Sequence, residues 1–67
     1  MTPKMTFQEA LGYYNLMRQM KDDLPDGMWD EVKEMAAEYR ETDKTDSDKE
    51  WFVEELQSIA KEWGHSL

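Results

Sequence analysis

The chain has 67 residues, of which 16 are acidic and 8 are basic, and its formal net charge is −8 at pH 7. This length allows one small domain, the absence of cysteine excludes disulfides and thiolate metal sites, and the negative charge disfavours direct binding to nucleic acid or to anionic membranes. The apolar runs are too short for a membrane span or an export signal, so we expect a cytoplasmic protein.

The first predicted helix spans residues 7–20. Before it, residues 1–5 contain Pro3 and show no periodicity, which indicates a loose lead-in. Thr6 and Glu9 fit a capping box, in which a hydroxyl and a carboxylate each accept a hydrogen bond from a backbone amide at the start of a helix. An apolar stripe follows at helical spacing: Phe7, Ala10, Leu11, Tyr14 and Met17.

Three further apolar residues of this helix spread onto a second side: Tyr13, Leu16 and Met20. One neighbouring helix cannot cover this much apolar surface. Either two helices pack against the first one, or these three side chains form a surface for self-association or docking. A homodimer is therefore one of the alternatives.

The second predicted helix spans residues 26–41 and differs on its two sides. Pro25 and Gly27 mark a turn before it, and the pattern leaves open whether the helix starts at Pro25 or after Gly27. Leu24, which stands among polar residues, is expected to fold back onto the core. The apolar side holds Met28, Trp29, Val32, Met35, Ala36 and Tyr39. The opposite side, at about 100° per residue, holds Asp30, Glu31, Glu34, Glu38 and Glu41.

This acidic row has a charge spacing close to that of one DNA strand. Its eleven steps cover about 16 Å at about 1.5 Å per residue, or one charge per roughly 4 Å. A DNA strand carries one phosphate per roughly 3.4 Å. The other interpretation is that the row only keeps a small domain soluble, because glutamates are common on the wet faces of helices.

The third predicted helix spans residues 48–63, after a polar connector. Ser47 and Glu50 repeat the capping-box spacing, and Gly64 stands where a left-handed residue commonly ends a helix. The inward stripe consists of Phe52, Leu56, Ile59, Ala60 and Trp63, with Val53 at its margin. Three amphipathic helices with short polar connections are typical of a small antiparallel bundle.

Glu50, Trp51 and Glu54 fall outside the inward stripe of the third helix. A large ring beside carboxylates suits contact with an arginine-bearing protein surface. If the helix is rotated relative to this estimate, Trp51 is instead half buried. Both interpretations stay open at this point.

No motif for catalysis or for a cofactor occurs in the chain. The connector from Asp43 has oxygen ligands at some calcium-loop positions, but Asp48 stands where the sharp turn of that loop needs glycine. His65 has Ser66 beside it and no third member for a hydrolase triad. We therefore expect a protein that is not an enzyme and that uses no metal and no cofactor.

These patterns predict an all-α fold, a small three-helix bundle that forms one acidic domain over residues 1–67, with residues 64–67 as a tail. The leading interpretation is a non-catalytic inhibitor, similar in style to those that phages encode, which presents a DNA-like carboxylate surface to a basic, nucleic-acid-handling protein. The expected contact residues are Asp30, Glu31, Glu34, Glu38, Glu41, Glu50, Trp51 and Glu54.

Two other functions fit parts of the pattern. An assembly module would use the apolar surface of Tyr13, Leu16 and Met20 to dimerise or to dock onto a larger complex. An antitoxin-like role fits the small size and the acidity. It is disfavoured because the chain lacks a basic segment that could read DNA.

Overall fold

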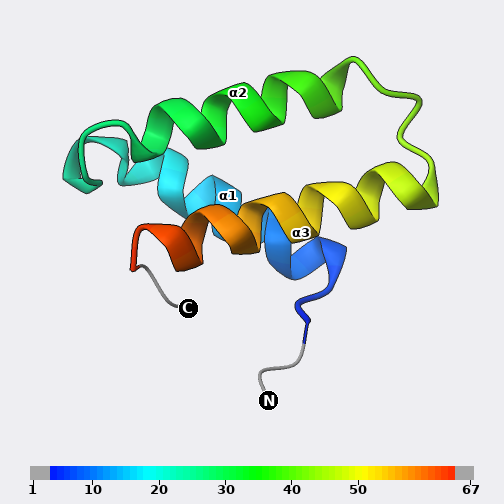
Figure 1. The fold of residues 1–67 in the computed structure, drawn as a ribbon, viewed down its shortest axis with the longest axis horizontal. Helices are drawn as coiled ribbons and strands as arrows, with labels where there is room; N and C mark the ends of the chain where they lie inside the picture. Colours follow the sequence, from blue (N-terminus) through cyan, green and yellow to red (C-terminus); the bar gives the residue numbers. More distant parts are fainter. Residues whose placement is uncertain (1–3, 65–67) are drawn as a thin grey trace.

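Three α-helices packed against one another form the part of the chain that the computed structural model describes, residues 4–64. The elements are α1 (Phe7–Gln19), the short 3-10 turn η1 (Lys21–Asp23), α2 (Met28–Arg40) and α3 (Asp46–Glu62), and no described residue lies in a strand. α2 and α3 run antiparallel and side by side, while α1 packs against both of them (Figure 1). The predicted three-helix bundle is confirmed. None of the described helices has the length and apolar character needed to cross a bilayer.

α1 begins where the capping pattern predicts. The Glu9 amide donates to the Thr6 hydroxyl oxygen at 3.2 Å, and the Thr6 amide donates to the Glu9 carboxylate at 3.0 Å. These bonds to the charged carboxylate, the one from the backbone above all, hold the pKa of Glu9 below its ordinary value. The helix ends at Gln19, with Met20 as its C-cap.

The buried side of α1 keeps most of the predicted stripe, with Phe7 and Tyr14 partly buried against the core, but it is turned toward Tyr13. Ala10, Tyr13 and Met17 are buried, whereas Leu11 is 36% exposed. Periodicity could not fix this orientation, because apolar residues cover most of the circumference of α1 and several rotations would each bury a plausible set. Two helices pack against α1 and bury Tyr13, which confirms the first of the two alternatives for this residue and excludes it from a self-association surface.

Gly27 decides where α2 starts. Its φ of 93° places it in the left-handed region as the N-cap residue, and α2 begins directly after it at Met28. A side-chain carbon at this glycine would lie 3.4 Å from the ring of Trp63, so the turn also packs closely on the end of α3. Leu24 is buried as predicted, at 7% exposure.

α3 begins at Asp46, two residues before the predicted start. The N-cap is Thr45, whose hydroxyl accepts from the Asp48 amide at 3.2 Å, while the Asp48 carboxylate accepts from the Thr45 amide at 3.1 Å. The capping box predicted at Ser47 and Glu50 is thus wrong, because Asp48 performs the role that the pattern assigns to glutamate. Gly64 follows α3 with φ 73°, as expected for a left-handed residue after a helix.

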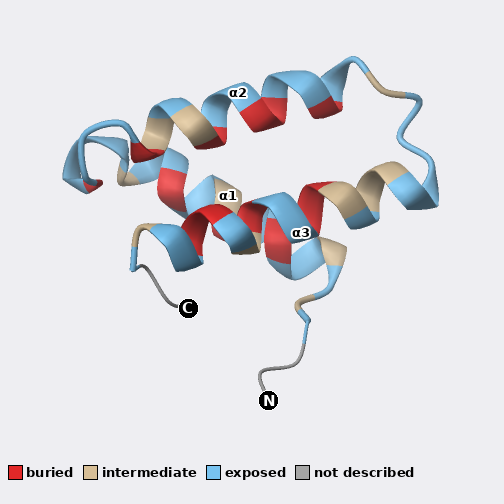
Figure 2. Cartoon of the chain, in the orientation of Figure 1, coloured by how far each residue is buried: buried red, intermediate tan, exposed pale blue. Residues whose placement is uncertain are grey.

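The core fills the space where the three helices meet (Figure 2). Its largest fully buried side chains are Met17, Met28, Val32, Phe52 and Leu56. Phe52 is the centre of an aromatic group, with its ring centroid 5.0 Å from that of Tyr39 and 5.7 Å from that of Phe7. All three helices therefore contribute to one core, and the acidic residues remain outside it.

Candidate functional site

A groove of about 290 Å³ runs between α2 and α3 on the surface of the bundle. Two buried side chains, Met35 and Ile59, form its apolar floor. Five carboxylates line it: Glu31, Glu34 and Glu38 from α2, and Glu55 and Glu62 from α3. Ser58 and Trp51 complete the lining. We call these nine residues the acidic groove.

Helical spacing explains why these residues share one face. On α2 the three glutamates stand at steps of three and four, and on α3 Trp51, Glu55, Ser58 and Glu62 follow at steps of four, three and four. On α2 the outermost glutamates are Glu31 and Glu38, and on α3 they are Glu55 and Glu62. In both cases they are seven residues apart, which corresponds to about 10 Å along a helix. The groove therefore has two short carboxylate rows of equal length.

The antiparallel course of the helices fixes which ends of the rows meet. Trp63 at the end of α3 donates a hydrogen bond from its indole nitrogen to the carboxylate of Glu31, in the first turn of α2. This contact also explains why Glu31 is only partly exposed while the other groove glutamates are exposed. The opposite end of the groove then holds Glu38 from α2 and Trp51 with Glu55 from α3.

The groove carboxylates have no cationic partner within the described residues. The ion pairs among residues 4–64 join Lys4 to Glu50 and Glu54, and Lys33 to Asp30, all outside the groove. Like charges one helical turn apart on α2 repel each other, by a few tenths of a kcal/mol per pair. The bundle thus holds five negative charges around one apolar floor and leaves them uncompensated.

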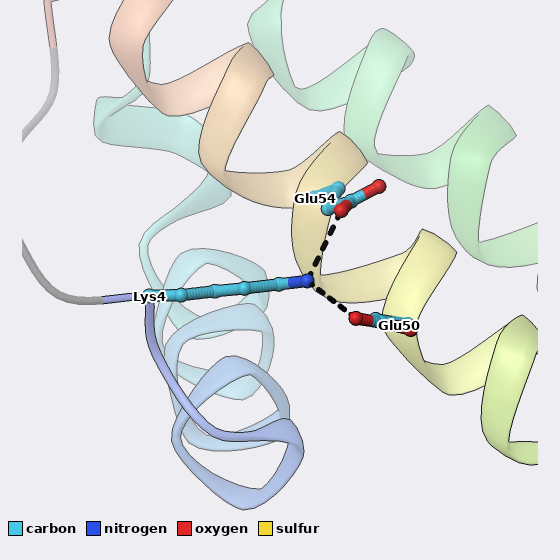
Figure 3. A network of polar contacts seen from close by, with 3 residues as sticks. All are labelled: Lys4, Glu50 and Glu54. Carbon is cyan, nitrogen blue, oxygen red and sulfur yellow. Dashed lines mark hydrogen bonds and ion pairs between the residues drawn. The ribbon is translucent and has the colours of Figure 1, made fainter.

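Lys4 compensates the acidic residues on the other side of α3 (Figure 3). Its ammonium lies 3.1 Å from a carboxylate oxygen of Glu50 and 3.0 Å from one of Glu54. The hydrogen bonds from Lys4, first to Glu54 and then to Glu50, raise the pKa of Lys4. Met5 packs against the core beside it. Residues 4 and 5 of the predicted loose lead-in are therefore attached to the bundle, and residues 1–3 lie outside the described part.

The structure divides the residues that the sequence predicted for partner binding. Glu31, Glu34, Glu38 and Trp51 line the acidic groove. The others lie elsewhere: Asp30 pairs with Lys33 at 3.7 Å, Glu41 caps the end of α2, and Glu50 with Glu54 binds Lys4.

Glu55 and Glu62 are the groove residues that the sequence analysis did not select. The signal was present, because both stand on the same side of α3 as Trp51, one turn and three turns after it. The sequence alone does not favour them over Glu50 and Glu54, because Glu50 is adjacent to Trp51 and Glu54 lies three positions after it, closer in the chain than Glu55. The residues of α3 that share a groove with the glutamates of α2 can be chosen only when the position of α2 is known.

The residues predicted for self-association also separate in the fold. Tyr13 is buried, Met20 is partly buried, and Leu16 is 48% exposed. In the described part of the chain, Leu11 is the other exposed large apolar residue. The surplus apolar surface of α1 is therefore smaller than the sequence suggests.

Within residues 4–64, no group of three or more histidines, aspartates and glutamates is arranged to hold a metal ion. In the connector before α3, the Asp48 carboxylate is engaged in capping the helix. His65 lies outside the described residues. What the acidic groove offers chemically is a set of hydrogen-bond acceptors with negative charge above an apolar floor, which is suited to a cationic ligand.

Comparison of the chain with protein-family models, with characterised proteins and with solved structures gives no match.

Proposed function

We propose that the protein is a non-catalytic binding module that covers the basic surface of a nucleic-acid-handling protein and thereby inhibits it. The observation that supports this proposal most directly is the acidic groove, in which five glutamates surround an apolar floor and pair with no cation among residues 4–64. A partner that supplies arginine and lysine would relieve the repulsion among these carboxylates. It would also cover Met35 and Ile59, which adds apolar contact to the charge attraction.

The charge of the whole chain supports the same proposal. A net charge of −8 on a bundle of 31 × 31 × 18 Å speeds encounter with a basic surface and opposes contact with DNA itself. Two carboxylate rows beside a groove offer two series of negative charges to a surface shaped for phosphates. The mechanism is therefore competition, in which the protein occupies the site that nucleic acid would otherwise occupy.

Affinity capture tests this proposal. The full-length chain is immobilised, lysate of the source organism is passed over it at low salt, and proteins that elute with salt are identified. We expect a nucleic-acid-binding protein whose interaction weakens by about tenfold or more between 50 and 200 mM salt, because several charge contacts are screened. We also expect short duplex DNA to compete for the captured protein.

A pair of matched variants locates the binding site. Glu38→Gln with Glu55→Gln removes two charges from the groove, and Glu50→Gln with Glu54→Gln removes two charges that bind Lys4 outside it. The groove variant is expected to lose most of the captured partner, and the control variant to retain it. A partner that both variants bind equally, or that stays bound in high salt, would contradict the proposal.

The assembly module remains a second candidate, because Leu16 is 48% exposed and Leu11 36%. Analytical ultracentrifugation of the pure chain separates this candidate from the first. A dimer that dissociates on Leu16→Glu would favour assembly through α1. A monomer whose partner binding depends on the acidic groove would favour the inhibitor.

A further inference from the structure

Trp51 differs from the other aromatic residues in what surrounds its ring. The ring pairs among residues 4–64 connect Phe7, Tyr14, Trp29, Tyr39 and Phe52, and Trp51 belongs to none of them. The cation contacts to rings in the same part of the chain involve Lys44 over Tyr39 and Lys49 over Phe7. Trp51 is partly buried against the core and lines the acidic groove with its remaining surface.

The groove therefore combines three chemical features. The indole offers a flat π surface, Met35 and Ile59 offer an apolar floor, and Glu38 and Glu55 offer carboxylates from the two helices. Glu55 is one helical turn from Trp51, on the same side of α3. A ligand that satisfies all three features must be flat, cationic, rich in hydrogen-bond donors and carried on an apolar stem.

Among protein side chains, arginine has this combination. Its guanidinium is planar, stacks on aromatic rings and donates two parallel hydrogen bonds to a carboxylate, and its three methylenes can cover apolar surface. Lysine has a compact, strongly hydrated ammonium, which lacks a flat face. An acidic surface without the indole would discriminate less between the two residues, because only the paired hydrogen bonds would then favour arginine.

We infer that the acidic groove recognises arginine in preference to lysine, with a guanidinium of the partner stacked on Trp51 and bonded to the neighbouring glutamates. The inference rests on the proposed function and specifies the partner segment as one that presents arginine. Trp51 is then the residue that determines specificity, while the glutamates supply most of the attraction. Cation contact with an indole predicts an arginine preference of about three- to tenfold in affinity.

The test uses the full-length chain and two fluorescent peptides of equal length, one of arginine only and one of lysine only, in low-salt buffer. Fluorescence anisotropy measures both dissociation constants. We expect the wild-type chain to bind the arginine peptide more tightly. Trp51→Leu should bring the two constants together, and Trp51→Phe, which keeps a smaller ring, should give an intermediate ratio.

Controls separate a local effect from loss of fold. Circular dichroism and thermal melting establish that each variant is folded, and Trp51→Phe carries the test if Trp51→Leu is not. Leu16→Ala removes exposed apolar surface from α1 and should leave the arginine preference unchanged. An arginine preference of the same size in all three residue-51 chains would overturn the inference.

The outcomes distinguish this inference from the proposed function. If both peptides bind equally, and both are lost in Glu38→Gln with Glu55→Gln, the groove is a general cation site and the inference alone fails. If neither peptide binds the wild-type chain at low salt, the groove does not take basic segments, and the proposed function fails with the inference.

Discussion

Tyr13 shows how the tertiary structure can give a residue a role that its sequence position does not reveal. Its side chain is 6% exposed, and its hydroxyl has no hydrogen-bond partner within the described residues. Burial of an unpaired hydroxyl opposes folding, since the group gives up its bonds to water. The ring contributes apolar contact to the core, and the hydroxyl reduces the net benefit.

Tyr13→Phe is therefore expected to stabilise the fold. The variant keeps the ring and removes the unpaired hydroxyl, and the free energy of unfolding should rise by about 1 kcal/mol. Urea denaturation at pH 7 measures this change. Tyr14→Phe is the control, because Tyr14 is only partly buried and stacks on Trp29, and its effect should stay within about 0.5 kcal/mol. A destabilised Tyr13→Phe chain would contradict the interpretation.

Tyr13 also makes the free energy of unfolding depend on pH in the alkaline range. Burial raises the pKa of Tyr13 above its ordinary value of 10.0, so the folded chain binds the phenol proton more tightly than the unfolded chain does. The stabilisation that Tyr13 gives in its neutral form is complete below the ordinary pKa of 10.0. It is lost as the pH rises from there through the raised pKa of the folded chain. The stability advantage of Tyr13→Phe should therefore grow above about pH 10. An advantage that is constant from pH 7 to pH 11 would exclude this linkage.

At the scale of the elements, the ends of the helices were the hardest features to place. Two overlapping capping boxes precede α3, and the earlier one, from Thr45 to Asp48, is formed. Its carboxylate belongs to aspartate, which reaches the cap amide from the third helical position as glutamate does at α1. The preference for glutamate in the pattern led to the later start.

Alanine substitutions separate the two capping boxes. Thr45→Ala removes the hydroxyl that accepts from Asp48, and we expect a loss of about 1 kcal/mol in the free energy of unfolding. Ser47→Ala is the matched control, because Ser47 lies inside the first turn and its replacement by a good helix former should cost nothing. Chemical denaturation of both variants measures their free energies of unfolding and shows which residue caps the helix. The reverse order of effects would place the cap at Ser47.

Gly27 before α2 and Gly12 inside α1 should respond to alanine substitution in opposite directions. Gly27→Ala forces a side chain into the left-handed region and against the Trp63 ring, and should destabilise the fold by about 1 kcal/mol or more. Gly12→Ala, in the interior of α1 with open space around it, should stabilise by about 0.5 to 1 kcal/mol. Thermal melting of both variants measures these effects. Equal effects would show that the turn at Gly27 is not constrained.

At the scale of the whole molecule, stability and binding place opposite demands on charge. The net charge is −8, and the ion pairs among residues 4–64, which Lys4 and Lys33 form, lie outside the acidic groove. Self-repulsion therefore remains greatest where the proposed partner would bind. A basic partner would remove that repulsion, so binding should also stabilise the fold.

Salt should consequently have opposite effects on the stability of the fold and on partner binding. Raising NaCl from 20 mM to 0.5 M shortens the screening length from about 20 Å to about 4 Å, which weakens the repulsion and should raise the melting temperature by several degrees. The same change should weaken partner binding. The exposed Lys4 pairs contribute little to stability, so their screening should not reverse the trend. Calorimetry in a salt series measures the melting temperature, and a fall across the series would contradict this account.

The sequence by itself determined that three amphipathic helices form and that their acidic residues stay in water. Periodicity and composition are local properties, and they predicted α1 within one residue at its end, the burial of Leu24, and the glutamates of α2 that later line the groove. Capping chemistry was equally local at Thr6 and Glu9. It was ambiguous only where two boxes overlapped.

Only the tertiary structure decided how each helix is rotated and which acidic residues face each other. Packing of α1 against two helices buried Tyr13 and exposed Leu11, a choice that the apolar pattern left undetermined. The pairing of α2 with α3 brought Glu55 and Glu62 into the acidic groove, and the position of residue 4 assigned Glu50 and Glu54 to Lys4. The physical reason is that these contacts join residues far apart in the chain, whereas helical spacing relates only residues a few positions apart.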